Sequence, residues 1–435
     1  MERFALSRMK EWKENENRKP LIIRGARQVG KTWIMKTFGQ QYFEKTAYVN
    51  FDNNARMKQV FEGDLDIERL VLAISAETGV SIEAENTLII FDEVQEVPKA
   101  LTSLKYFYEN APQYAIVAAG LLLGVALHQG TSFPVGKVDF LDLYPLNFRE
   151  FLCAMGEKQF VSMLDSCDTQ MVTVFKTKYI ERLREYYFVG GMPEVVKDFS
   201  EKKDYNRVRA IQKNLINYYQ QDFSKHAEIK LVPRLNLVWN SIPMQLAKEN
   251  KKYIYGQVRE GSRAKDFELA IQWLLDCGLI HKVQRIQKPD LPLKAYIDFD
   301  AFKLFLVDIG LLIAMTDLDA KVIIEGNKIF TEFKGALTEQ YILQQLISDV
   351  GVIPYYYSTQ NSKGEIDFLV QGKTSVIPIE VKAEENLKAK SLKAFCEKYQ
   401  PSYAVRTSMS DYREQDWMTN IPLYAIKWIE NYVNQ

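Results

Sequence analysis

Residues 21–32, with the sequence LIIRGARQVGKT, decide the fold of the first part of this chain. Residues 25–32 match the phosphate-loop pattern of a glycine, four variable residues, Gly-Lys and then Ser or Thr. The apolar residues before the pattern predict a short buried strand, and residues 32–38 predict a helix. A strand, a glycine-containing loop and a helix in this order form the context in which the pattern binds phosphate.

The residue types in this loop indicate how it would hold a nucleotide. Glycines let successive backbone N–H groups point at one anion, and the helix N-terminus adds unpaired donors and the positive end of its dipole. Lys31 is expected to reach the β- and γ-phosphates as a catalytic group, and the Thr32 hydroxyl is expected to bind Mg²⁺. We therefore predict contacts to ATP from Gly25, Ala26, Arg27, Gln28, Val29, Gly30, Lys31, Thr32, Trp33 and Asp92.

A second apolar run, residues 88–91, is followed directly by Asp92 and Glu93. Ligands of open α/β sheets bind at the carboxyl ends of the strands, where these two side chains would lie. Asp92 is expected to hold Mg²⁺ together with Thr32, and Glu93 is expected to orient or deprotonate the attacking water. The alternative is an exposed acidic turn after a core strand, and the phosphate loop favours the catalytic interpretation.

The apolar run 114–118 ends in Ala119-Gly120-Leu121. NTPases with an additional strand usually carry a polar residue near the γ-phosphate here, and Leu121 stands where Ser or Asn is expected. We therefore expect hydrolysis to be slower than binding suggests. Arg149 and Lys137 are the candidates for an arginine-finger role, and the alternative for Arg149 is a structural ion pair.

Composition limits the class of protein. A chain of 435 residues, with 47% hydrophobic and 26% charged residues, is expected to form about two to four globular domains. Lys+Arg and Asp+Glu are both 56, so net charge gives no argument for nucleic-acid binding. Four scattered cysteines and three histidines do not support a zinc site. We expect a cytoplasmic protein without a membrane partner, because no signal peptide and no apolar run near the roughly 20 residues of a bilayer span is found.

Apolar runs and helical periodicity alternate in the first part of the chain. This alternation predicts an α/β fold with a parallel sheet, in which an additional strand separates the strand of the phosphate loop from the acidic strand. We predict a P-loop ATPase domain over residues 1–150 and a helical region over 151–227. A winged-helix-like domain is predicted over 228–315, and a C-terminal α/β domain over 316–435.

Two carboxylates and a lysine mark the C-terminal domain. Asp367 begins one apolar strand, and Glu380 and Lys382 share a face of the next because side chains repeat every two residues on a strand. Asp367 and Glu380 are predicted to hold a divalent metal for phosphodiester cleavage, Lys382 to position the nucleophile, and Glu339 to be an extra ligand. This predicts a restriction-endonuclease-like core, although Glu-x-Lys is also common on exposed strands.

The predicted winged-helix region carries a run of basic residues that could contact the phosphates of DNA or RNA. The alternative is a solvated surface, because Glu249, Glu260 and Asp266 lie among them. The basic residues are Lys248, Lys251, Lys252, Arg259, Arg263 and Lys265.

In combination, five motifs resemble a bacterial and archaeal family of AAA-type ATP-binding proteins that join an N-terminal P-loop ATPase to a C-terminal domain of unknown function with a nuclease-like core. The resemblance runs along nearly the whole chain and implies ATP binding at residues 25–32 and Asp92. The motifs are residues 24–32, 91–95, 144–151, 190–193 and 379–382.

Three functions remain open at this point. The first is a Mg²⁺-dependent ATPase coupled to a nuclease-like module that interacts with nucleic acid. The second is a non-cleaving switch, in which ATP orders the domains and the C-terminal module binds a partner. The third is an oligomeric, ring-forming protein remodeller, with Arg149 or Lys137 acting across subunits.

Overall fold

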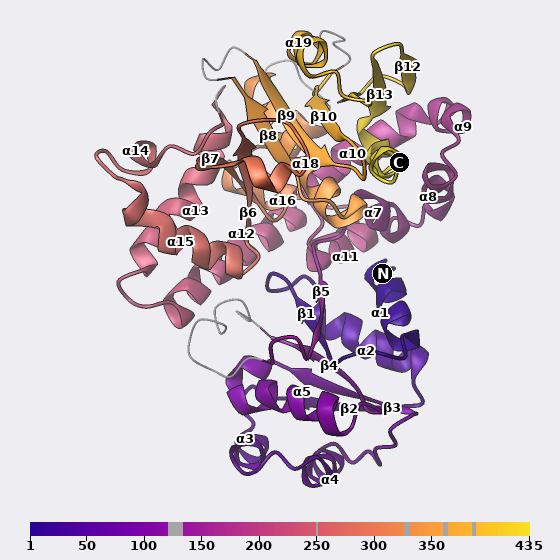
Figure 1. Ribbon diagram of the computed structural model, residues 1–435, viewed down its shortest axis with the longest axis vertical. Coiled ribbons are helices and arrows are strands. Elements are labelled where there is room, and N and C mark those ends of the chain that lie inside the picture. Colours follow the sequence, from indigo (N-terminus) through magenta and orange to yellow (C-terminus); the bar gives the residue numbers. More distant parts are fainter. Residues whose placement is uncertain (121–133, 249–250, 326–330, 360–363, 385–388) are drawn as a thin grey trace. The chain divides into compact units, whose positions relative to one another are not determined.

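The computed structural model describes residues 1–120, 134–248, 251–325, 331–359, 364–384 and 389–435 (Figure 1). The chain divides into two compact units. Residues 2–144 and 276–278 form the N-terminal unit, and residues 145–275 and 279–435 form the C-terminal unit. No helix in the described part of the chain combines the length and apolar character that crossing a bilayer requires.

The N-terminal unit is built on a five-stranded sheet in the order β2-β3-β4-β1-β5, and every neighbouring pair is parallel. Strand β4 lies between β1, which leads into the phosphate loop, and β3, which ends at the acidic pair. The predicted additional strand is therefore confirmed. The strands are β1 Leu21–Arg24, β2 Lys45–Asn50, β3 Thr87–Asp92, β4 Ala115–Ala119 and β5 Asp139–Asp142.

The apolar side chains of the central strands point alternately to the two faces of this sheet, so both faces are packed. Ile89 and Phe91 belong to the core that includes Phe61 of α3, and the neighbouring residues of β3 point to the opposite face because side chains alternate. The Phe61 and Phe91 rings meet edge to face at 5.7 Å. The helices of this unit are α1 Ala5–Glu14, α2 Lys31–Tyr42, α3 Ala55–Glu62, α4 Ile67–Thr78, η1 Val94–Glu96 and α5 Pro98–Asn110.

The C-terminal unit begins with a run of helices, as the sequence predicts for residues 151–227. Asn147 starts the first of them with a capping box, in which Asn147 and Glu150 each bind the other's backbone N–H. The helices up to the sheet are α7 Phe148–Ala154, α8 Lys158–Asp165, α9 Thr169–Val174, α10 Lys176–Val189, α11 Pro193–Lys202, α12 Tyr205–His226, α13 Val232–Leu246, α14 Tyr255–Val258 and α15 Ala264–Asp276. The later helices are η2 Leu293–Tyr296, α16 Ile309–Met315, α17 Ala320–Ile324, α18 Thr331–Gln345, η3 Leu346–Val350, α19 Lys390–Tyr399, η4 Leu423–Ile429 and α20 Glu430–Val433.

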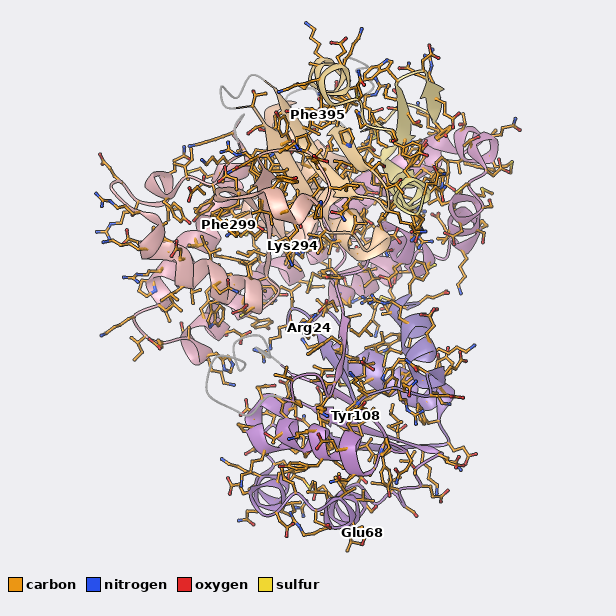
Figure 2. The ribbon with its side chains drawn as sticks, in the orientation of Figure 1. Arg24, Glu68, Tyr108, Lys294, Phe299 and Phe395 are labelled. Carbon is orange, nitrogen blue, oxygen red and sulfur yellow. The ribbon has the colours of Figure 1, made fainter. Side chains whose placement is uncertain are left out.

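An eight-stranded mixed sheet forms the centre of this unit, in the order β12-β13-β11-β10-β9-β8-β6-β7. On one side of it, Phe395 of α19 packs into a core with Leu369 and Ile366 of β9 (Figure 2). The strands are β6 Ile280–Ile286, β7 Ile297–Leu306, β8 Tyr355–Ser358, β9 Glu365–Gln371, β10 Val376–Val381, β11 Val405–Ser408, β12 Arg413–Gln415 and β13 Met418–Pro422.

Strands β6 and β7 extend the sheet of the C-terminal strands. The two strands pair antiparallel with each other, and β6 pairs parallel with β8. These two strands of the predicted winged-helix-like region therefore lie at one edge of the larger sheet, and a separate winged helix is not confirmed. The restriction-endonuclease-like core is not confirmed either. The predicted domain boundaries at 150/151, 227/228 and 315/316 all stay predictions.

Candidate functional site

The phosphate loop has the backbone conformation that its glycines predict. Gly25 has φ +144° and Gly30 has φ +95°, both in the region that favours glycine. A Cβ atom at Gly25 would lie 2.1 Å from the carbonyl oxygen of Leu143. Any other residue at position 25 would therefore force the loop away from the strand beside it.

An ion pair fixes the entry to the loop. Arg24, at the carboxyl end of β1 (Figure 2), donates to Asp142 at the end of β5 through two hydrogen bonds of 2.8 and 2.9 Å. A two-point contact of this kind sets the orientation of both side chains. The strand that carries the loop is therefore attached to its neighbour at the residue before Gly25.

Lys31 is held inside the loop by backbone carbonyl groups. Its ammonium group donates to the carbonyl oxygens of Gly25 and Ala26, each at 2.8 Å. Burial lowers the pKa of Lys31 to about 8, although the negative charges of Glu93 and Asp92 partly oppose this shift. A lowered pKa means that the surroundings stabilise the ammonium charge less than water does, so an anion in the loop would be favoured.

Asp92 lies almost fully buried at the carboxyl end of β3, with 4% of its surface exposed. The hydroxyl groups of Thr32 and Tyr48 donate to its Oδ2 at 2.6 and 2.9 Å, and the N–H of Glu93 donates to its Oδ1 at 3.1 Å. The structure therefore brings Thr32 and Asp92 together, as the sequence predicts for a Mg²⁺ site.

Tyr48 is a residue of this site that the sequence analysis missed. It lies on β2, two residues before Asn50, which is the register partner of Asp92. Side chains two residues apart share a face of a strand, so the pairing of β2 with β3 would have revealed it. Burial, followed by the charge of Asp92, raises the pKa of Tyr48, which keeps its hydroxyl a donor.

The donor set at this site suits Mg²⁺. Among the residues that the structure describes, no group of three or more His, Cys, Asp or Glu side chains is arranged to hold a metal. Mg²⁺ does not need such a group, because it usually takes one or two carboxylates and completes its shell with water and substrate phosphates. Thr32 and Asp92 at 2.6 Å fit this requirement.

Glu93 follows Asp92 in a left-handed backbone conformation, with φ 52° and ψ 43°. A non-glycine residue rarely adopts this conformation. One carboxylate oxygen of Glu93 accepts a hydrogen bond of 2.7 Å from the side chain of Gln95. The expected base is therefore at the end of β3, and a second side chain orients it.

The candidates for an arginine finger have local partners. The guanidinium group of Arg149 pairs with Asp349 at 2.8 Å and also contacts Asp165, and 12% of its side chain is exposed. Lys137 pairs with Glu109 at 3.0 Å. These contacts support the structural alternative for Arg149. Leu121 lies outside the described residues, so its predicted effect on hydrolysis stays a prediction.

The C-terminal carboxylates also come together. The antiparallel register pairs Ile379 with Phe368 and so places Glu380 opposite Asp367. Lys382 donates to Oε1 of Glu380 at 2.6 Å, and the N–H of Val381 donates to Oδ2 of Asp367 at 2.7 Å. Glu339 of α18 lies close enough to Asp367 for each carboxyl group to shift the pKa of the other. The structure thus unites all four residues that the sequence singles out here, but Glu339, Asp367 and Glu380, all of them described, are not arranged as a group of three carboxylates that could hold a metal.

Two lysines that the sequence analysis left out of this site neutralise much of it. Lys303 is fully buried and lies 3.6 Å from Oε2 of Glu339, and it also donates to Glu365. Lys251 pairs with Oε1 of Glu339, so it cannot serve as a phosphate contact in the expected basic patch. A lysine within the apolar run 301–307 is a sequence signal that could have identified Lys303.

We call Lys251, Lys303, Glu339, Glu365, Asp367, Glu380 and Lys382 the carboxylate–lysine cluster. Burial, with the charges of Glu339 and Glu380, raises the pKa of Asp367 well above its usual range. Burial also raises the pKa of Glu380, whereas Lys251 and Lys303 outweigh burial and lower the pKa of Glu339. With Asp367 protonated, three ammonium groups face three carboxylates.

Comparisons with known proteins also distinguish an N-terminal domain from the later parts of the chain. Residues 17–152 match an AAA domain, residues 180–322 match a domain of unknown function (DUF8612), and residues 334–426 match a domain of unknown function (DUF4143). The chain thus carries an AAA domain followed by a C-terminal domain of unknown function, as the resemblance implies. No curated protein matches the chain.

Three solved structures are similar to the chain at low identity. A Walker-type ATPase of Pyrococcus abyssi is 15% identical, with a TM-score of 0.44 over 72% of this chain and 95% of that one. The ORC1 protein of Aeropyrum pernix in complex with DNA is 13% identical, with a TM-score of 0.27 over 72% and 91%. Cdc6p of Pyrobaculum aerophilum is 10% identical, with a TM-score of 0.25 over 74% and 93%. The P-loop ATPase fold of the N-terminal unit rests on its own sheet order and phosphate loop.

Proposed function

We propose that this protein binds ATP with Mg²⁺ at its phosphate loop and hydrolyses it. The observation that carries the proposal is the environment of Lys31: a partly buried ammonium group held by carbonyl groups, at the carboxyl end of a parallel sheet. Such a group is stabilised by an anion, and in phosphate loops the N–H groups of the loop and of the start of the following helix bind the same anion.

Each residue of the site has a distinct part in the proposed reaction. The loop N–H groups and Lys31 bind the β- and γ-phosphates, and Thr32 and Asp92 would hold Mg²⁺. When bound, the ion would neutralise charge that develops on the phosphate oxygens. Tyr48 keeps the Asp92 carboxylate oriented by donating to the same oxygen as Thr32. Glu93 orients the attacking water and accepts its proton.

Phosphate release from ATP by the full chain tests the proposal. We expect turnover with Mg²⁺, none in the presence of a chelator in excess over the ion, and strongly reduced turnover for Lys31→Ala. Lys58→Ala, which removes an exposed lysine of α3 in the same unit, is the matched control and is expected to match the wild type. Turnover that Lys31→Ala leaves unchanged would contradict the proposal.

A second candidate function is a nuclease-like module at the carboxylate–lysine cluster. Two buried oxygens favour it: Oε2 of Glu380 has no hydrogen-bond partner among the described residues, and Oε2 of Glu339 has only the ammonium group of Lys303, at 3.6 Å. Buried polar atoms are rarely left unpaired, so a cation is a reasonable partner for them. Asp367 and Glu380 would hold it once Asp367 loses its proton, and Lys382 would position the nucleophile. The ion would activate water for phosphodiester cleavage.

The alternative for the cluster is a non-cleaving module that ATP switches. The pairing of three lysines with three carboxylates supports it, because paired charges satisfy each other. Mn²⁺ titration followed by electron paramagnetic resonance separates the two. Binding that Glu380→Ala abolishes, together with Mn²⁺-dependent cleavage of DNA or RNA, would favour the nuclease; binding without cleavage, or no binding, would favour the switch.

The proposed partner of the C-terminal unit is DNA or RNA, and the proposed compartment is the cytoplasm. The four cysteines, all of which the structure describes, form no disulfide with one another, which supports a reducing compartment. ATPase rates with and without DNA or RNA at low salt would test the partner, and stimulation is expected. Molecular mass with and without ATP would test whether an oligomer forms.

A further inference from the structure

The side chain of Gln95 connects the expected base to the end of the neighbouring strand. Its Nε2 donates to Oε2 of Glu93 at 2.7 Å. Its Oε1 occupies the space beside Gly120, where a Cβ atom would lie only 2.3 Å away. One carboxamide therefore contacts Glu93 at the end of β3 and the backbone at the end of β4.

We propose that Gln95 is the positioning residue of Glu93 in ATP hydrolysis, and that Gly120 is required to make room for it. This inference rests on the proposed ATPase function. NTPases with an additional strand usually carry a polar side chain at the tip of the strand that corresponds to β4. In this chain the side chain of Gln95 supplies the polar group instead. It reaches that place from η1, the short helix that follows the acidic strand.

The backbone explains why Glu93 needs a second residue to orient it. Glu93 lies in the left-handed region and directly precedes the three-residue helix η1. A glutamate has three side-chain torsions, and a general base must reach its water within hydrogen-bond distance. The bond from Gln95 holds one carboxylate oxygen and leaves the other for the water. A misplacement of about 1 Å at a reacting group can cost about 100-fold in rate.

The lack of space for a side chain at position 120 is a second observation, independent of the hydrogen bond between Gln95 and Glu93. Gly120 is not one of the described glycines with a positive φ, so its backbone conformation does not require a glycine. A Cβ atom at position 120 would instead meet Gln95, because at 2.3 Å from Oε1 the carboxamide would have to move. Gly120→Ala should therefore displace Gln95 and release Glu93, although neither residue is itself substituted.

The test compares turnover and nucleotide binding in Gln95→Ala, Gln95→Met, Gly120→Ala and the double variant Gln95→Ala/Gly120→Ala. Gln95→Met keeps the bulk of the side chain and removes the donor, so it separates the hydrogen bond from packing. Gln41→Leu, which changes an exposed glutamine of α2, is the control. Circular dichroism verifies that each variant is folded, and a fluorescent ATP analogue measures binding.

We expect Gln95→Ala and Gln95→Met to lower kcat by about 10-fold or more, the effect of losing a hydrogen bond to a charged group, while the Kd for the analogue stays within about twofold. Gly120→Ala should lower kcat similarly, and the double variant should be no slower than Gln95→Ala, because the clash has been removed.

Three results would overturn the assignment. An unchanged kcat in Gln95→Met with normal turnover of the wild type would remove Gln95 alone and leave the ATPase function intact. A raised kcat would mean that Gln95 restrains Glu93. Additive losses in the double variant would mean that Gly120 acts independently of Gln95. No turnover by the wild type would instead overturn the ATPase function and this inference together.

Discussion

Lys31 and Lys303 are the same residue type in two polar sites, and their pKa values move in opposite directions. Burial lowers the pKa of Lys31 to about 8, and the carboxylates Glu93 and Asp92 do not compensate for it. Lys303 is fully buried, yet Glu339 and Glu365 outweigh burial and raise its pKa above the usual range. The charge of Lys31 is incompletely neutralised, whereas the charge of Lys303 is already neutralised by its two carboxylates.

This difference indicates what each site can accept. A phosphate group entering the loop supplies the anion that Lys31 lacks, so nucleotide binding is favoured there. The carboxylate–lysine cluster has no such excess of positive charge, and its unpaired atoms are carboxylate oxygens. It is therefore better suited to accept a cation or to remain as a structural unit than to bind an anion.

The largest expected effect is on stability, from Lys303→Met. Removing this ammonium group takes the buried partner away from Glu365 and from Oε2 of Glu339. Breaking a buried pair in this way costs about 3–5 kcal/mol in the free energy of unfolding. Urea unfolding measures it, and Lys334→Met, which breaks the more exposed pair with Glu384 at 3.0 Å, should cost about 1 kcal/mol or less. Equal losses in both variants would show that the cluster contributes no special stability.

Lys31→Ala should have the next largest effect, on ATP affinity. Hydrogen bonds to charged groups contribute about 1.5–3 kcal/mol, so the Kd should rise by about 10- to 100-fold. Titration with a fluorescent ATP analogue measures this change, with Lys58→Ala as the control. An unchanged Kd would indicate that Lys31, like Lys303, is already neutralised by its neighbours.

The pH dependence of ATP affinity should show a smaller effect. Phosphates favour the ammonium form, so the pKa of Lys31 should be higher with ATP bound than the value of about 8 without it. Below pH 8 the ammonium form is present in both states and affinity is constant. Above pH 8 binding requires proton uptake, so affinity should fall by up to about 10-fold per pH unit. Titrations at pH 7, 8 and 9 measure it. Lys31→Arg stays charged and should lose this dependence; the same slope in both proteins would assign it to another group.

Asp367→Asn should have the smallest effect. If Asp367 is protonated at neutral pH, as its raised pKa indicates, the amide replaces one neutral group with another of similar shape. The free energy of unfolding at pH 7 should change by about 1 kcal/mol or less, whereas Glu339→Gln should cost about 3–5 kcal/mol because it leaves Lys251 and Lys303 without their shared anion. Equal and large losses from both variants would show that Asp367 is ionised.

Local patterns predicted the nucleotide-binding unit well. The strands β1, β3 and β4 lie within a few residues of the apolar runs that predict them, because the inner strands of a parallel sheet are buried on both faces. The side chains that meet at the ends of β1 and β3 come from two short motifs, so spacing alone brings Lys31, Thr32, Asp92 and Glu93 to one edge. Their catalytic roles stay predictions.

The residues that were missed depend on pairing between distant segments. Tyr48 reaches Asp92 only through the register of β2 with β3, and Lys303 reaches Glu339 only through the packing of β7 against α18. Strand β11 was not predicted because three of its four buried residues are polar. Two of these, Arg406 and Ser408, both donate to Oδ1 of Asn420. An apolar pattern cannot identify a strand whose interior is satisfied by side-chain hydrogen bonds.

The measurement that tests the central claim most directly is ATP turnover by Glu93→Gln beside its binding of the fluorescent ATP analogue. Glu96→Gln, in the short helix η1 that follows Glu93, is the matched control and changes an exposed carboxylate. Our account predicts that Glu93→Gln keeps the Kd within about twofold and loses about 10²- to 10⁴-fold in kcat, the usual contribution of a general base. Glu96→Gln should behave as the wild type. Turnover by Glu93→Gln equal to that of the wild type would contradict the account.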